Sequence, residues 1–297
     1  MALTSPALTL SIEALFGNIK PTLDAVKKLG FTDFSTEKPG VDIKPGATIK
    51  VPVSSVSAAS AYDESNNNYE TGGDTSWATL TATHYLQGFD ITGTNVDQGV
   101  NAGRMKQLFT GRAGTGIAMA IQDAIKTAFD TNSIVPVSTG VTIAAAGTAA
   151  AADYLGLASD VSWLNKSTSV LAVNGTELAY IKAKFAAINV VPASLTELAQ
   201  YMGFKDLVLI PGMTARMVIV PANSLGFIAR VPEIIADYKE IGVETDPDTG
   251  LAVGIVIASV QKTNKLVANA DLWFGCATHA SAAAAGSAGI VKVGTAV

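Results

Sequence analysis

Charged side chains are scarce in this sequence. They make up 15% of its 297 residues, against roughly 25% in ordinary soluble domains. Lysine and arginine number 20 against 25 aspartates and glutamates, so the net charge is −5 and the pI is near 5.1. This balance excludes the basic surface that a dedicated DNA-binding module needs to hold phosphates. So little charge also predicts that some of the subunit's surface is hidden against partners.

Cysteine and histidine are almost missing as well. The one cysteine, Cys276, excludes an intrachain disulfide. No basic residue precedes Lys20, so a signal-peptide n-region is lacking and we expect an intracellular product. His84 and His279 lie far apart and outside any metal-ligand spacing, which predicts no metal and no cofactor. We expect both histidines to be structural or surface residues and the Cys276 thiol to be inert.

No long, strongly hydrophobic run is present. The uncharged stretch from Thr131 to Ala152 is about long enough to cross a bilayer. Its apolar residues are mostly alanine, however, and Pro136 and two glycines interrupt it without aromatic or basic anchors at its ends. We therefore predict no membrane partner.

What the sequence does contain is a mixture of helix and strand patterns. The spacing predicts a short helix over residues 20–30, with Pro21 in its first turn, and a long helix over 101–130. Between them, period-two patterns predict strands at 48–53 and 76–94, which bracket a polar segment. Strands are further predicted at 169–173, 207–210, 217–220, 238–244, 251–260, 272–276 and 290–293, and helices at 176–188, 195–202 and 222–228.

The two early strands form a hairpin that needs support. An isolated two-stranded hairpin is only marginally stable in water. Either its own domain covers it, or it projects and lies on a neighbouring subunit; the helix at 20–30 leaves the same two alternatives. For the projecting case, the candidate subunit-contact residues are Ile49, Val51, Val53, Tyr62, Tyr69, Trp77, Tyr85 and Phe89.

Two segments imitate enzyme motifs. The glycines from Gly111 to Gly116 lack the spacing and the following Lys-Ser/Thr of a phosphate-binding loop, which favours a helix kink or a close packing contact. Ala222 to Gly226 resembles the nucleophile elbow of α/β hydrolases, with Ser224 as nucleophile and Asp248 or Asp271 and His279 following in order. The oxyanion segment of that fold is missing upstream, so we predict no enzyme and keep a serine hydrolase as a distant alternative.

The order of parts resembles the major capsid proteins of tailed bacteriophages with the HK97-type shell fold. An N-terminal arm, a projecting hairpin, a long helix, a mixed α/β region and a late antiparallel hairpin follow one another over nearly the whole chain. Local similarities are Pro45–Pro52 before the hairpin, Met217–Asn223, Glu244–Gly250 before a long strand, and Leu272–Gly275 before the last strand.

The resemblance implies an α+β fold and a structural role. Copies of the chain would form pentamers and hexamers of an icosahedral shell around double-stranded DNA, held without sequence specificity, in the virion and, during assembly, in the host cytoplasm. Scaffolding, portal and decoration proteins are further implied partners. An encapsulin-type nanocompartment shares this fold and is the alternative. The implied parts are an N-terminal arm (1–34), an extended hairpin loop (35–94), a peripheral domain with a spine helix (95–165), an axial domain (166–229), peripheral strands (230–265) and C-terminal strands that complete the axial domain (266–297).

Overall fold

The structure is a computed structural model, and it contains both helices and strands, so the predicted mixed class is confirmed. The residues that it describes are 12–29, 32–33, 48–54, 75–91, 102–132, 141–159, 164–222, 224–230, 238–247, 251–260, 265–278 and 290–295.

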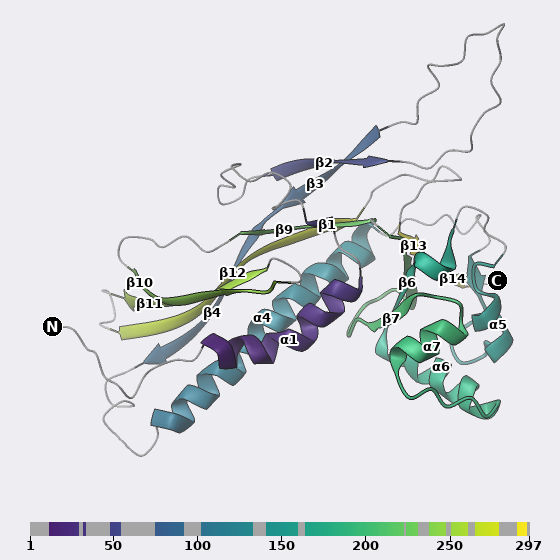
Figure 1. Cartoon of the computed structure of the whole chain (residues 1–297), viewed down its shortest axis with the longest axis horizontal. Coiled ribbons are helices and arrows are strands. Elements are labelled where there is room, and N and C mark those ends of the chain that lie inside the picture. The colour runs from purple at the N-terminus through teal and green to yellow at the C-terminus, as the bar shows by residue number, and fades with distance from the viewer. Residues whose placement is uncertain are drawn as a thin grey trace, which may run out of the picture.

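A six-stranded sheet forms the first part of the molecule (Figure 1). Its main path runs β1-β9-β12-β11-β10, and β4 pairs with the other side of β12. The strands are β1 (Thr32–Asp33), β4 (Thr83–Ile91), β9 (Leu225–Arg230), β10 (Tyr238–Thr245), β11 (Ala252–Val260) and β12 (Lys265–Thr278). The antiparallel pairing of β10 with β11 confirms the hairpin predicted from the late turn sequence.

Two helices pack against this sheet, α1 (Ile12–Lys28) and α4 (Ala102–Asn132). They contact each other, and α4 contacts β12 and β4. The helix predicted over residues 101–130 is thus confirmed as one continuous element. At Gly114, an added Cβ would lie 2.6 Å from the Cβ of Asn18, so this glycine permits the close approach of α1. Of the three glycines, Gly114 is therefore a packing contact between helices and Gly116 one with the Gln87 side chain of β4, whereas an added Cβ on Gly111 would meet nothing within 4 Å.

Helix α1 is longer than the predicted helix, and Pro21 lies inside it. The prediction placed its start near residue 20 because proline favours a first turn. Leu15 and Ile19, on the N-terminal side of Pro21, are fully buried with Leu23 and Val26. Their burial outweighs the one backbone hydrogen bond that a proline inside a helix removes.

A four-stranded sheet with three helices forms the second part. Its order is β13-β8-β6-β7, with β6 (Val170–Val173), β7 (Asp206–Leu209), β8 (Met217–Val220) and β13 (Val291–Lys292). Helices α5 (Ala151–Gly156), α6 (Gly175–Ala187) and α7 (Leu195–Tyr201) belong to this part, with a 3-10 turn at Lys166–Thr168. β5 (Thr142–Ile143) pairs in parallel with β14 (Gly294–Thr295). Of the two hydrophobic clusters, the first lies between α1, α4, the six-stranded sheet and one face of the four-stranded sheet, with Val170, Val208 and Val218 in it, and the second lies between the other face of the four-stranded sheet and α5, α6 and α7.

The remaining strands, β2 (Thr48–Ser54) and β3 (Thr75–Thr81), form an antiparallel ribbon. They make a two-stranded sheet of their own. Figure 1 shows the ribbon on one side of the body, directed away from the six-stranded sheet. At its lower end β3 passes through Ala82 into β4, so the ribbon and the sheet share one nearly continuous strand.

One predicted element differs from the structure. The helix predicted at 222–228 is wrong, because Leu225–Arg230 is strand β9, with Phe227 paired to Cys276 and Leu225 buried. Further along the chain, β12 pairs with β4, β9 and β11, and β13 joins the second sheet, while the division into peripheral and axial domains stays a prediction. Strand order depends on contacts between distant segments, which local patterns do not encode.

Candidate interaction surfaces

The base of the ribbon is fixed where the chain crosses β12 at Gly275. An ideal Cβ on Gly275 would lie 2.0 Å from the carbonyl oxygen of Thr81 and 3.2 Å from the Cα of Ala82. Leu80 and Ala82 on either side of the crossing are 1% and 2% exposed. The ribbon therefore starts from a tightly packed point, and its direction is set by the body of the subunit.

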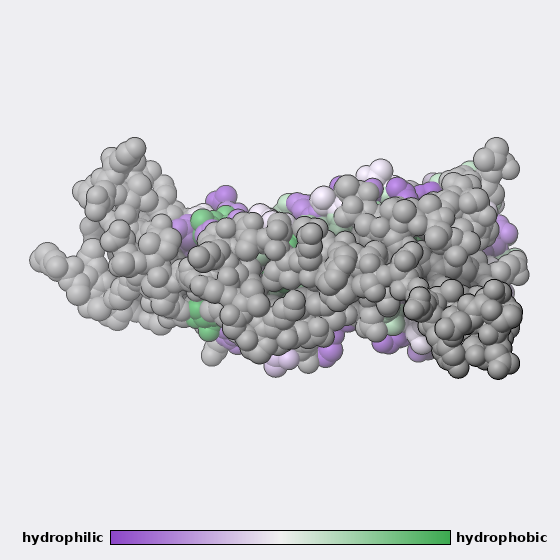
Figure 2. Space-filling view, turned by 90° about the horizontal axis from the view of Figure 1, so that it is seen from above, coloured by the Kyte–Doolittle hydropathy of each residue, from purple (hydrophilic) through white to green (hydrophobic). Residues whose placement is uncertain are grey.

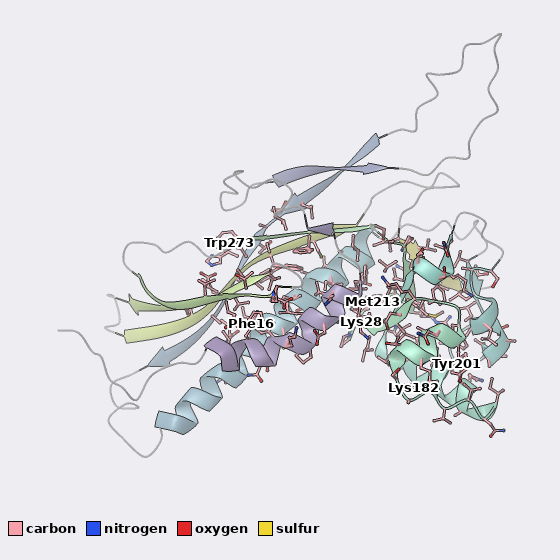
Figure 3. The ribbon with its side chains drawn as sticks, in the orientation of Figure 1. Phe16, Lys28, Lys182, Tyr201, Met213 and Trp273 are labelled. Carbon is pink, nitrogen blue, oxygen red and sulfur yellow. The ribbon has the colours of Figure 1, made fainter. Side chains whose placement is uncertain are left out.

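Three side chains form a cluster beside this crossing. The His84 ring stacks on Trp273, with centroids 4.3 Å apart, and His84 Nε2 pairs with a carboxylate oxygen of Asp271. His84 lies opposite Trp273 in the β4–β12 register. Burial raises the pKa of Asp271, although the nearby His84 opposes that shift. His84 thus has structural contacts although it is exposed, which agrees with a structural or surface residue, and Trp273, on which it stacks, is labelled in Figure 3.

The predicted subunit-contact residues are divided among several places. Ile49, Val51, Val53 and Trp77 lie on the ribbon, where Val51 is paired with Ala78 and Pro52 with Trp77. Phe89 lies on β4, in register with Ala268. Tyr85 is half-buried and packs against the core of its own subunit. Tyr62 and Tyr69 lie outside the described residues. The contact role of this set stays a prediction.

A second surface, which the sequence analysis missed, is formed by α6, the loop after it and the last residue of α7. Three large apolar side chains are exposed there: Ile188 by 50% and Val191 by 81% in the loop, and Tyr201 by 50% on α7. The outward side of α6 adds alanines and one lysine, Lys182, and Figure 3 shows Lys182 and Tyr201 at the same end of the molecule. The spacing of Ala179, Ala183 and Ala186 could have indicated an uncharged outer helix face. We call Ile188, Val191, Tyr201 and this face the α6 surface.

Seen from above, the coloured surface residues in Figure 2 are a mixture of hydrophilic and hydrophobic types, with the green areas small. On that side, the described residues form no single broad apolar face.

A buried ionic network holds α6 in place. Glu177 is 1% exposed, and Arg216 donates to both its oxygens, from Nε at 2.9 Å and from Nη2 at 3.0 Å. The Tyr154 hydroxyl donates to Glu177 at 2.7 Å, and Arg216 Nη1 donates to the Ala144 carbonyl. Burial, followed by the hydrogen bond to Glu177, raises the pKa of Tyr154. The network ties α5, α6 and β8 together.

Polar contacts also join the first part to the second. Near the end of α4, Asp130 accepts hydrogen bonds from the backbone N–H groups of Thr214 and Ala215 and pairs with Lys126 of its own helix at 3.1 Å. Near the end of α1, Lys28 pairs with Asp206 at 3.2 Å. In Figure 3, Lys28 and Met213 mark this junction. These contacts add to the hydrophobic cluster that the two parts share.

The Asp130 contact predicts a loss of stability in acid. Burial alone raises the pKa of this carboxyl, but hydrogen bonds from Lys126, Ala215 and Thr214 outweigh it and hold the pKa below its ordinary value. A carboxyl with a lowered folded-state pKa stabilises the fold above its unfolded pKa, and this contribution is lost as pH falls through the folded value. Asp130→Asn should lower the free energy of unfolding by about 1 to 2 kcal/mol at pH 7. The difference from the unmodified protein should shrink below about pH 4.

Urea denaturation at pH 7, 4 and 2.5 measures this difference. Asp123→Asn is the matched control, because Asp123 is an exposed residue of the same helix. That control should change the free energy of unfolding by less than about 0.5 kcal/mol. An Asp130→Asn variant that is as stable as the unmodified protein at pH 7 contradicts the assignment.

The described residues do not place Ser224 in a hydrolase site. Ser224 is 4% exposed, and its hydroxyl donates to the Pro221 carbonyl at 2.7 Å. The turn is followed by strand β9 and not by the helix of a nucleophile elbow, and Asp271 pairs with His84. Asp248 and His279 lie outside the described residues. Burial raises the pKa of the Cys276 thiol to about 12, which confirms an inert cysteine.

The described residues also bear on metal binding and on membrane crossing. Among the described residues, no group of three or more His, Cys, Asp or Glu side chains is placed to hold a metal ion. Within those residues, no helix combines the length and the hydropathy needed to cross a bilayer. The uncharged stretch after Thr131 includes β5 and α5, whose Ile143 and Tyr154 are buried in the second core.

Comparison with known proteins gives similarity at the level of structure only. No family model and no curated protein matches the chain. Among solved structures, a chain from Mycobacterium phage Adephagia is 16% identical with a TM-score of 0.49, over 92% of this chain and 90% of that one. A virus-like particle from Pyrococcus furiosus is 12% identical with a TM-score of 0.49, over 95% and 96%. The capsid of an empty GTA particle is 13% identical with a TM-score of 0.47, over 84% and 91%.

These structures are of the kind that the sequence resemblance predicts: a phage chain, a capsid and a virus-like particle. Their identities lie below 25% and their TM-scores below 0.5. The function proposed for this chain therefore rests on its own geometry.

Proposed function

We propose that this chain is a major capsid protein with the HK97-type fold, whose copies assemble into an icosahedral shell around double-stranded phage DNA. The observation that carries the proposal is the ribbon. β2 and β3 form a sheet of only two strands that extends from a tightly packed base (Figure 1). Two strands alone are marginal in water, so a second copy is the natural surface for them to lie on.

The other parts have roles consistent with this proposal. The six-stranded sheet with α1 and α4 corresponds to a peripheral domain, with α4 as its spine helix. The second part corresponds to an axial domain, which brings the α6 surface of each copy toward the five-fold and quasi-six-fold axes. Little charge lies there to be desolvated, so apolar contact between copies costs little. The α6 surface supports this assignment because large exposed apolar side chains mark interaction sites.

The net charge of −5 suits a container for DNA. Strong phosphate contacts at the inner wall would hinder release, whereas an acidic subunit holds DNA weakly and without sequence specificity. In this proposal scaffolding, portal and decoration proteins are further partners, and the location is the virion after assembly in the host cytoplasm.

A shortened ribbon tests the proposal. Lys50 is paired with Thr79, so residues 51–78 can be replaced by a two-residue Asn-Gly turn that closes a shorter hairpin. The buried base at Leu80 and Ala82 is kept. We expect the subunit to remain folded, with an unchanged circular dichroism spectrum, and the yield of closed particles to fall at least about tenfold because the neighbour contact is lost.

Light scattering and negative-stain images give the readout. The unmodified protein, alone or with a scaffolding protein, should form closed particles of megadalton mass. If it remains a 30.5 kDa monomer under all assembly conditions, the shell proposal is wrong. If the shortened variant closes normal particles, the ribbon is not the contact that the proposal requires.

A further inference from the structure

Two edge strands of the six-stranded sheet, β10 and β4, differ in how they are protected; the third, β1, has only two residues. β10 carries Lys239, Glu240 and Glu244, and its register with β11 shifts between Glu240 and Gly242. Charges and such bulges are the devices by which proteins prevent a further strand from pairing with an edge. β4 has no bulge and less charge. Its nine residues keep an unbroken register with β12, and Asp90 is the only acidic or basic residue among them apart from His84.

β4 also exposes an apolar side chain. Leu86 is 55% exposed, and Gly88 beside it is exposed too. Within the described part of the chain, β12 is the one strand that pairs with β4. Helix α4 contacts β4 on the opposite face, where Gly116 approaches the Gln87 side chain. A long, regular edge with an exposed leucine is a template for strand addition.

We propose that the free edge of β4 pairs with strand β3 of the ribbon from a second copy of this chain. This inference rests on the proposed function and specifies the place on the neighbour that receives the ribbon. Among the described residues, each of the two elements has an unpaired edge. The ribbon consists of two strands, and β4 pairs with a strand on one side only. Pairing the two joins a marginal ribbon to a stable sheet.

β3 is the strand of the ribbon that suits this pairing. β2 contains Pro52, which has no backbone N–H to donate to a ladder. The seven residues of β3 contain neither proline nor charge. The charges in these segments are also complementary, since the ribbon strands carry Lys50 and β4 carries Asp90.

A charge at the edge tests the inference. Leu86→Lys places on β4 the residue that most often blocks edge pairing. Met119→Lys is the matched control, because Met119 is 57% exposed, much like Leu86, and lies on helix α4, which is not an edge strand. We expect both variants to fold with similar melting temperatures. Leu86→Lys should reduce the yield of closed particles at least about tenfold, and Met119→Lys should leave it unchanged. Equal yields from the two variants would overturn the inference.

Cysteine crosslinking identifies the strand that pairs with the edge of β4. Leu86→Cys on one chain is mixed with Ser76→Cys, Trp77→Cys, Ala78→Cys or Thr79→Cys on another, and the assembled particles are oxidised. The unmodified chain, whose Cys276 is buried, gives the background. We expect dimers between the two chains, strongest at alternate positions of β3, because neighbouring residues of a strand point to opposite sides. Dimers formed only between two Leu86→Cys chains indicate a two-fold β4–β4 contact and overturn the inference.

Hydrogen exchange separates failure of this inference from failure of the proposed function. Amides of residues 83–91 should exchange more slowly in particles than in free subunits. If particles form and these amides exchange equally fast in both, the inference is wrong and the shell function stands. If the unmodified protein forms no particles, both are wrong.

Discussion

Replacing Gly275 with alanine is expected to destabilise the subunit by about 3 kcal/mol or more. The added Cβ would lie 2.0 Å from the Thr81 carbonyl oxygen, a separation that real Cβ atoms essentially never show. The obstacle is backbone, so no side-chain rotation can relieve it. Either β12 or the strand that passes through Ala82 has to move, and the packing of Leu80 and Ala82 is lost with it.

The measurement is urea denaturation of Gly275→Ala beside Gly17→Ala. Gly17 lies in α1, and an added Cβ there would meet nothing within 4 Å. The same chemical change should therefore stabilise the protein at position 17 by about 0.5 to 1 kcal/mol, because alanine favours helix. A Gly275→Ala protein as stable as the unmodified one contradicts the crossing of Thr81 over β12. Loss of soluble protein for position 275 alone supports it.

The contrast between these glycines shows what sequence patterns can and cannot predict. Helix α4 was predicted at 101–130 and is found at Ala102–Asn132, because three-and-four spacing is a local property. The reason for the glycine at 275 lies in Thr81, nearly two hundred residues away. Close approach of two backbones leaves no local trace beyond the glycine itself, so the ribbon's base could not be predicted.

The same limit explains the errors in strand assignment. Leu225 to Arg230 has no strong period, and the preceding strand and turn favoured a helix. Leu225 and Phe227 are buried where β9 pairs with β12, and this burial stabilises a strand at these residues. For the candidate interface, Ile49, Val51 and Val53 were correctly placed on an early strand. The α6 surface was missed because exposure of Val191 and Tyr201 depends on the packing of α6 against α7.

Breaking the Glu177–Arg216 pair is the second substitution for which we expect a large effect. Glu177→Gln should lower the free energy of unfolding by about 3 to 5 kcal/mol, because it leaves the Arg216 guanidinium without its counter-charge in a nearly buried site. The Tyr154 hydroxyl loses its charged acceptor as well. Asp24→Asn is the control, since its pair with Lys20 is exposed and should contribute less than about 1 kcal/mol.

A double-mutant cycle separates the interaction energy of the Glu177–Arg216 pair from the cost of burying its two charges. In Glu177→Leu with Arg216→Met, no uncompensated charge is left, so the double variant should be more stable than either single variant. The α6 surface offers an independent readout, because the network holds the helix that carries it. We expect Glu177→Gln to reduce particle yield at temperatures where the first part remains folded, while Asp24→Asn assembles normally. If the two single losses add in the double variant, the side chains act independently and the network does not position α6.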